Sequence, residues 1–195
     1  MALLRIIRRT IYNQKFLPGL FLVLLSATEI GMISPVQKES PNAAQVKAVF
    51  LFNFAQFVEW PDQTFPAAKA PLIIGVLGKD PFKSYLDETI LGESINGHPL
   101  IIHRYNKLQD IKNCHILYIN LYQPDQLEDV LAALKGRRIL TVSDAPKFAQ
   151  SGGIIQFVTV NNKIRMRINQ ENAQASELTI SSKLLRLAEI VSSTK

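Results

Sequence analysis

Short apolar runs recur through the middle of the chain, and segments of helical periodicity separate them. The runs cover residues 72–77, 99–104, 114–119 and 138–142. Their length and the turn residues around them are typical of β-strands, and the continuously apolar third run is typical of a strand buried on both faces of a parallel sheet. Strands that alternate with helices are joined by right-handed crossovers. The sequence therefore predicts an α/β fold, a three-layer α/β/α sandwich with a mostly parallel sheet.

Two helices are expected in the first half of the chain. Residues 45–58 carry apolar side chains at spacings of three and four, with Asn42 as N-cap and Trp60-Pro61 as the stop. After the first apolar run, Asp80 and Pro81 have the positions of an N-cap and a first helical residue. A second helix is therefore expected to begin at Pro81.

Two more helices are expected in the second half. Residues 124–135 form a helical pattern that Gly136 closes. Residues 181–191 predict a last helix with one apolar face. The side chains on that face are Leu184, Leu185, Leu187, Ala188 and Val191.

A different pattern separates these two helices. Residues 153–160 and 163–168 flank Asn161-Asn162, a dipeptide suited to a type I′ turn. The sequence therefore predicts a C-terminal antiparallel hairpin at one edge of the sheet.

The N-terminus has the order of a secretory signal peptide. Four basic residues precede the apolar run 16–25, which is too short for a helix that must cross about 30 Å of hydrocarbon. Cleavage is expected at 26–28 or near Ser34, and a retained anchor is the alternative. The predicted organisation is a signal peptide over 1–34, a polar leader over 35–44 and one domain over 45–195, which locates the mature protein in the periplasm.

Net charge and cysteine content limit the classes of partner and of covalent cross-link that the chain can have. The formal net charge of +6 falls to +3 when four basic residues and one acidic residue leave with the signal. That balance gives no reason to expect a nucleic-acid partner. Cys114 is the only cysteine, so no disulfide can form within the chain, and its apolar surroundings predict a buried, inert thiol.

Polar residues follow the expected strands, at the edge where open parallel sheets bind ligands. They form a candidate pocket made of Gly78, Asp80, Asn120, Ser143 and Asp144. Turn and cap chemistry explains the same residues. No dinucleotide fingerprint, phosphate-binding loop or nucleophile elbow accompanies them.

Histidine and cysteine do not supply the missing chemistry. His98 and His103 lack a third ligand at metal spacing, and Cys114 and His115 are neighbours on a strand, so their side chains point to opposite faces. We therefore expect no enzyme, no metal site and no cofactor. The sequence predicts a binding module.

An ordered set of short strings gives the chain a family resemblance. The strings are FAQFVEWP at 54–61, GVLGKDPF at 75–82, CHILYI at 114–119, LTVSD at 140–144, FAQSGGII at 148–155, IN at 168–169 and SSKLLRLA at 181–188. In this order they resemble the YfiR-like family of exported bacterial proteins, and the likeness covers nearly all of the chain after Gln45.

The resemblance implies a non-enzymatic periplasmic regulator. Such a protein binds the periplasmic sensor domain of an inner-membrane diguanylate cyclase and represses it, and an OmpA-like outer-membrane lipoprotein can sequester the regulator. Release of the cyclase raises cyclic di-GMP and favours biofilm formation. Family members with redox control carry further cysteines in intrachain disulfides. With Cys114 alone, this chain departs from that pattern.

The hairpin region holds the residues expected to contact a partner, because an exposed sheet edge offers main-chain groups to another chain. They are Phe148, Ile155, Phe157, Arg165, Arg167 and Asn169. Each also has a structural interpretation: Ile155 and Phe157 as core residues, Arg165 and Arg167 as a solvated strand face, and Asn169 as a helix cap. The same edge allows self-association into a homodimer.

A second hypothesis is a periplasmic receptor for a small ligand. The solute would dock at the strand ends, near Gly78, Asn120 and Ser143. The size of the domain argues against the usual two-lobed clamp.

Overall fold

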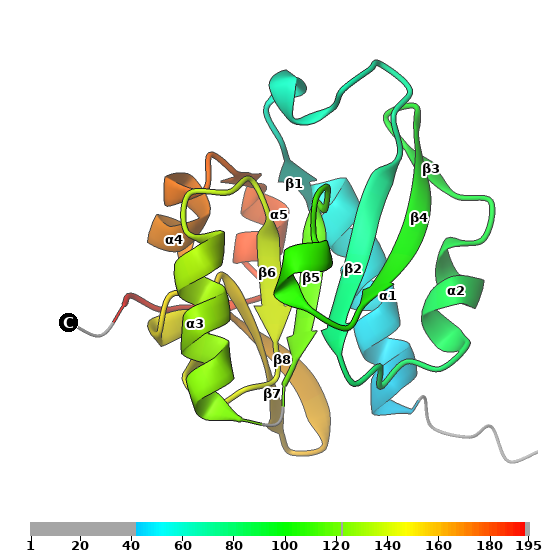
Figure 1. The fold of residues 1–195 in the computed structure, drawn as a ribbon. Coiled ribbons are helices and arrows are strands. Elements are labelled where there is room, and N and C mark those ends of the chain that lie inside the picture. The colour runs from blue at the N-terminus through cyan, green and yellow to red at the C-terminus, as the bar shows by residue number, and fades with distance from the viewer. Residues whose placement is uncertain (1–41, 122, 194–195) are drawn as a thin grey trace, which may run out of the picture. The chain divides into compact units, whose positions relative to one another are not determined.

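A twisted eight-stranded sheet forms the centre of the protein, as the computed structural model shows for residues 42–121 and 123–193 (Figure 1). These residues belong to one compact unit that spans 40–195. The predicted signal peptide and residues 35–41 of the polar leader lie outside the described residues. No helix of the described part has the length and apolar character that a membrane crossing requires.

The sheet has the order β10-β8-β7-β6-β5-β2-β4-β3. Its parallel part consists of β4 (His98–Tyr105), β2 (Leu72–Gly78), β5 (Ile116–Asn120), β6 (Leu140–Ser143) and β7 (Ile155–Val160). β3 (Ser94–Ile95) and β8 (Lys163–Ile168) run antiparallel to their inner neighbours β4 and β7. The mostly parallel sheet is thus confirmed.

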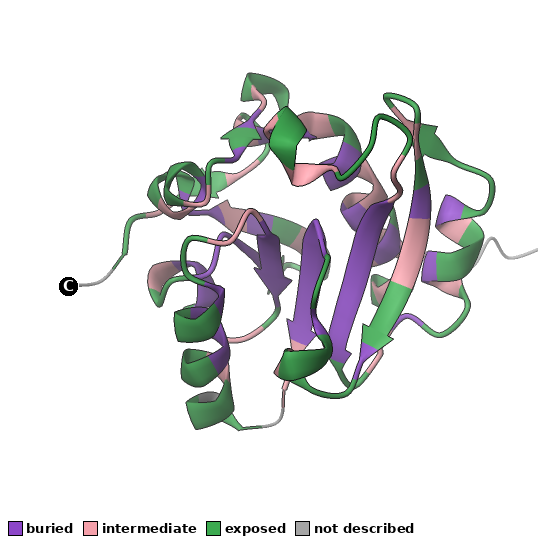
Figure 2. Cartoon of the chain, turned by 45° about the horizontal axis from the view of Figure 1, so that its top comes forward, coloured by how far each residue is buried: buried purple, intermediate pink, exposed green. Residues whose placement is uncertain are grey.

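Two apolar cores cover the two faces of the sheet, which is why its central strands are buried (Figure 2). One core contains residues of α1 (Ala43–Phe57) and α2 (Tyr85–Ile90), and the other contains residues of α3 (Pro124–Leu134). Three short 3₁₀ turns complete the connections: η1 (Asp62–Thr64), η2 (Leu108–Asp110) and η3 (Phe148–Gln150). The expected sandwich of three layers is confirmed.

Local sequence signals explain several element ends. Asn42 and Gln45 form a capping box at the start of α1. Asn161 and Asn162 both have positive φ, which is the type I′ geometry expected for the β7–β8 turn. The buried face of α1 is formed by Ala48, Leu51, Phe54 and Ala55, whereas the apolar Val49 is 48% exposed.

The helix expected from Pro81 begins four residues later. The Asp80 carboxylate accepts a hydrogen bond from the Phe82 main-chain N–H in a local turn, and Lys83 has a φ of 54°. This path buries the Phe82 ring against Tyr118, with ring centroids 4.8 Å apart. Burial of Phe82 thus overrides the Asp-Pro helix signal, and α2 follows Ser84 instead.

The long C-terminal helix is also corrected. α4 (Gln170–Ala175) and β9 (Thr179–Ile180), which pairs with β1 (Val58–Glu59), precede a single helical turn, α5 (Ser182–Leu185). β10 (Glu189–Ile190) then adds to β8 in parallel, and Val191 N–H donates to Ile168 C=O. Leu187 is 66% exposed as a result. The main-chain groups of residues 189–191 form hydrogen bonds with the open edge of β8 in place of a further helical turn.

The hairpin was expected at the sheet edge, but β10 covers the end of β8 and is itself the edge strand there. β10 pairs only with Arg167 and Ile168. Within the described residues, no strand pairs with the outer side of β8 between 163 and 166.

Candidate functional site

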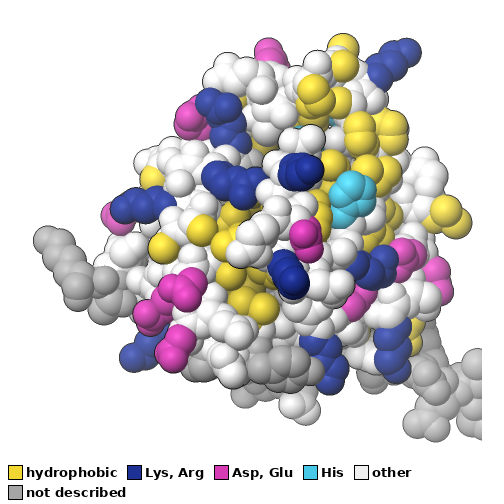
Figure 3. Space-filling view, viewed as in Figure 1, with side chains coloured by type: hydrophobic (Ala, Val, Ile, Leu, Met, Phe, Trp, Pro, Cys, Tyr) yellow, Lys and Arg dark blue, Asp and Glu magenta, His cyan; other side chains and the backbone are white. Residues whose placement is uncertain are grey.

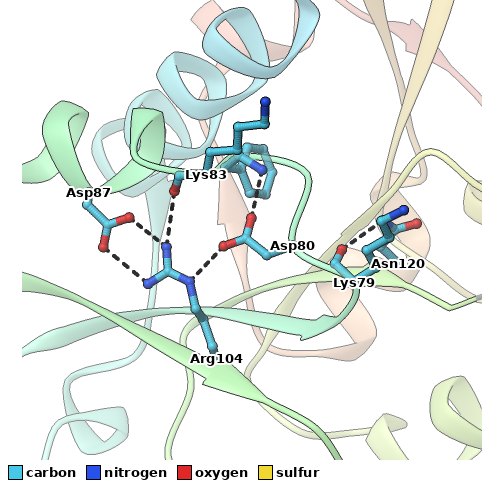
Figure 4. A network of polar contacts seen from close by, with 7 residues as sticks. Lys79, Asp80, Lys83, Asp87, Arg104 and Asn120 are labelled. Atoms are coloured by element: carbon cyan, nitrogen blue, oxygen red, sulfur yellow. Dashed lines mark hydrogen bonds and ion pairs between the residues drawn. The ribbon is translucent and has the colours of Figure 1, made fainter.

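The carboxyl ends of β2 and β5 are joined by their own polar groups. Lys79 N–H donates to Asn120 C=O at 3.1 Å, and the Asn120 side-chain amide donates to Lys79 C=O at 2.8 Å (Figure 4). Gly78 packs so closely that a Cβ placed on it would lie 2.3 Å from Asn120 O. Gly78 and Asn120 are thus neighbours, and the Asn120 carbonyl and side-chain N–H are both hydrogen-bonded to Lys79.

Arg104 of β4 ties Asp80 to α2. Its guanidinium contacts Asp80 and Asp87 at 2.6 Å each and Lys83 C=O at 3.4 Å (Figure 4). Hydrogen bonding to Arg104 lowers the pKa of Asp87, and the two carboxylates raise the pKa of Arg104. The Arg104 side chain is 42% exposed, so each pair adds little stability by itself. The network fixes the loop between β2 and α2.

Ser143 and Asp144 follow β6 and have different roles. The Ser143 hydroxyl donates to Ile119 C=O at 2.7 Å and accepts from Ala145 N–H, so it is fully engaged. The Asp144 carboxylate accepts hydrogen bonds from the Tyr118 hydroxyl at 2.7 Å and from Lys47 Nζ of α1 at 2.6 Å. Burial and the Asp144 charge raise the pKa of Tyr118. Asp144 is thus the member of the predicted pocket that is bonded to α1.

Replacing Tyr118 by phenylalanine is expected to lower the free energy of unfolding by about 1–2 kcal/mol, because a buried hydroxyl loses a bond to a charged acceptor. Water can reach Asp144, whose side chain is 39% exposed, which limits the loss. Urea denaturation measures the change. Tyr85→Phe is the matched control, since no hydrogen bond of that hydroxyl occurs in the described structure, and an equal loss in both variants would contradict the assignment.

Of the six residues predicted to contact a partner, four are buried and two lie at the surface. Phe148, Ile155, Phe157 and Asn169 are at most 2% exposed. The Phe157 ring stacks against Phe54 at 5.9 Å, and the Asn169 side chain accepts from Asn172 N–H as the N-cap of α4. Arg165 and Arg167 are the members that lie at the surface, on the β8 face opposite the buried Met166 and Ile168.

A groove lies where β6 ends and β7 continues. It has a volume of about 570 Å³. Its lining joins both predicted sets and comprises Lys47, Asp144, Pro146, Lys147, Gln156, Phe157, Val158, Thr159 and Arg167. We call this feature the β7 groove.

Gln156 is the unusual member of the β7 groove. It is 3% exposed, yet its side-chain oxygen has no hydrogen-bond partner. A buried polar atom without a partner costs about 1–3 kcal/mol, so such atoms in native proteins require an explanation. Sequence reasoning missed Gln156, although a glutamine between Ile155 and Phe157 in a buried strand was a usable signal.

His115 and Cys114 point to opposite faces, as expected. Cys114 belongs to the α3 core, and burial raises its thiol pKa to about 12. The His115 ring lies on the other face and stacks on Phe65, with centroids 4.6 Å apart. Its Nδ1 accepts from Ile73 N–H at 3.0 Å, which leaves the proton of the neutral ring on Nε2. Among the described residues, no three His, Cys, Asp or Glu side chains group in a way that could hold a metal.

Charged side chains are mixed on the surface. Lys and Arg alternate with Asp and Glu over the face viewed in Figure 3. Ion pairs at the surface of the described structure include Arg138–Glu177 and Arg167–Glu189. This face carries no continuous basic stripe of the kind that nucleic-acid grooves present.

Comparisons with known proteins place the fold in context. A protein-family model described as YfiR/HmsC-like matches residues 44–189, which include nearly all of the described structure. No curated protein sequence matches the chain. Among solved structures, the ABC domain in complex with L-Trp from Streptococcus pneumonia is similar, with 12% identity and a TM-score of 0.45. The match covers 62% of this chain and 55% of that one, so this chain spans about half the length of that relative.

Proposed function

Because this chain belongs to the YfiR/HmsC-like family, we propose that it represses an inner-membrane diguanylate cyclase by binding the cyclase's periplasmic sensor domain. The family supports a periplasmic regulatory role in general, and the cyclase is the specific partner proposed here. In this proposal the N-terminal signal exports the chain. An OmpA-like outer-membrane lipoprotein that sequesters it would release the cyclase, raise cyclic di-GMP and promote biofilm formation.

The family match over 44–189 carries this proposal, and the site chemistry supports it. The Lys79 N–H and C=O are hydrogen-bonded to Asn120, and the Ser143 hydroxyl is hydrogen-bonded to Ile119 C=O. This arrangement does not favour the alternative of a solute receptor at the strand ends. Open polar and charged groups lie instead along the hairpin and the β7 groove, where a macromolecule can reach them.

Repression by contact needs only a difference in affinity. A regulator that binds the inactive state of the cyclase more tightly shifts the population toward that state. A preference of about 2.7 kcal/mol shifts it about a hundredfold. No chemical step on a substrate is part of this mechanism.

We expect the mature chain to bind the isolated periplasmic domain of the cyclase at micromolar concentration or better, as measured by biolayer interferometry. Arg165 is exposed on the hairpin, so Arg165→Glu is expected to weaken binding about tenfold. Lys135→Glu makes the same charge change just after α3, toward the opposite ends of the strands, and should leave binding unchanged.

Two results would contradict the proposal. The first is no binding at tens of micromolar with a folded cyclase domain. The second is unchanged cyclase activity in cells that lack the regulator. A homodimer of the chain, measured by sedimentation, is compatible with the proposal as long as the cyclase domain still binds.

A further inference from the structure

The outer half of β7 has main-chain groups with which no main-chain group of the described residues pairs. β7 pairs with β8 in full, but it pairs with β6 only at Ile155 and Gln156. Beyond that point β6 has ended, and the chain turns away through Asp144 and Lys147. The strand is therefore an inner strand at its start and an edge strand at its end.

The hairpin register shows which groups are free. Asn169 N–H donates to Ile154 C=O, so Ile154–Asn169 is a hydrogen-bonded pair, and the pairs alternate from there toward the turn. Phe157 and Thr159 thus direct their N–H and C=O away from β8. The ladder with Ser143 engages the Phe157 N–H. The Phe157 carbonyl and both main-chain groups of Thr159 face the β7 groove, and no main-chain hydrogen bond to them occurs in the described structure.

The charge around these groups is mainly positive. Lys47, Lys147 and Arg167 line the β7 groove with Asp144 as the single carboxylate. Lys163 and Arg165 are also exposed on the hairpin, and no acidic residue occurs between Asp144 and Glu171. Lys47 pairs with Asp144 at 2.6 Å and Arg167 pairs with Glu189 at 2.9 Å, so the positive charge that no ion pair of the described structure offsets is carried by Lys147, Lys163 and Arg165.

We propose that the β7 groove binds an extended, acidic segment of a protein partner, which pairs with β7 at Phe157 and Thr159 as an added strand beyond the end of β6. This inference rests on the proposed function in that the chain acts by binding a protein. Strand addition explains the free edge, because main-chain hydrogen bonds supply affinity in this mode of recognition. The Gln156 amide carries both a donor and an acceptor, which fits a peptide group of the incoming segment.

Fluorescence anisotropy with a labelled peptide tests the inference directly. The probe is Val-Glu-Val-Asp-Thr with blocked ends, added to the full mature chain. Thr159→Pro removes one groove-facing N–H that β8 does not use, and proline is tolerated at such edge positions. We expect Thr159→Pro to weaken binding at least tenfold, whereas Thr159→Ala, which keeps the N–H, should change it less than twofold.

Charge is tested separately. Lys147→Glu is expected to weaken binding five- to tenfold, and Lys135→Glu is expected to leave it unchanged. The same peptide with Gln and Asn in place of Glu and Asp should bind less tightly, and its affinity should depend less on salt. Circular dichroism and melting curves confirm that each variant is folded.

Several outcomes would overturn the inference. Equal binding of the peptide by Thr159→Pro and Thr159→Ala excludes strand addition. Competition by free aspartate at the peptide's own concentration indicates a small-anion site, and a dimer that Thr159→Pro abolishes assigns the edge to a second copy. If the cyclase domain binds Thr159→Pro as tightly as the unchanged chain, this inference fails while the proposed function stands. If the peptide binds and no cyclase domain does, the proposed function fails alone.

Discussion

Replacing Gly78 by alanine is expected to lower the free energy of unfolding by about 2–5 kcal/mol. Gly78 has a φ of +89°, where an L side chain costs about 1–2 kcal/mol. A Cβ there would also lie 2.3 Å from Asn120 O, a main-chain atom that cannot rotate away. The strands β2 and β5 would have to separate where Lys79 and Asn120 are hydrogen-bonded, and overpacking of this kind costs about 1–3 kcal/mol more.

Gly97→Ala is the matched control for this prediction. Gly97 has nearly the same φ, +84°, but a Cβ there meets nothing within 4 Å. Its loss is therefore expected to be the backbone strain alone, about 1–2 kcal/mol. Chemical denaturation of both variants separates the two causes. Equal losses of unfolding free energy in the two variants would show that the close approach of β2 and β5 adds nothing to the cost of the Gly78 substitution.

The sequence was most informative where local chemistry and burial agree. The apolar runs became strands because each is flanked by turn residues and is buried by a helix on at least one side. The Asn161-Asn162 turn and the Asn42–Gln45 capping box formed as expected because their hydrogen bonds depend on neighbouring residues only. These features account for the layers and for the order of the elements.

The amino-acid sequence was least informative where a residue distant in the chain determines the local conformation. Asp80 lost its role as a helix cap because Phe82 enters the core beside Tyr118, and Arg104 binds the Asp80 carboxylate from another strand. The C-terminal helix stopped after one turn because the edge of β8 offers hydrogen bonds to Val191 and an ion pair between Arg167 and Glu189. The sequence around Asp80 and around residues 181–191 gives no sign of these contacts with other strands.

The candidate site shows the same division. The strand-end residues were found from their position after apolar runs, and the structure confirms that Gly78 and Asn120 are neighbours. Lys47 contacts Asp144 from 97 residues away in sequence. The β7 groove exists because β6 is shorter than β7, and strand ends are the boundaries that patterns define least well.

Acidification from pH 7 to pH 4 is expected to remove about 3 kcal/mol of stability through His115 alone. Burial lowers the pKa of this ring to about 4, against about 6.5 in an unfolded chain, and repulsion from His98 adds to the effect. Between these values the unfolded state binds more protons than the folded state, so stability falls as the pH falls from about 6.5 through 4. The ring is 3% exposed, and a charged form would have to be accommodated beside Phe65 with Nε2 unpartnered.

His115→Gln isolates this contribution from the carboxylates that titrate in the same range. Its amide has no charge at any pH in the experiment and carries an oxygen that can accept the Ile73 N–H in place of Nδ1. At pH 7 the variant is expected to be the less stable protein, because it loses the stack on Phe65. Denaturation at pH 7, 6, 5 and 4 should bring the two stabilities together as the pH falls, by about 3 kcal/mol in total. Parallel curves would mean that the buried imidazole does not control the acid response, and another group would then have to account for it.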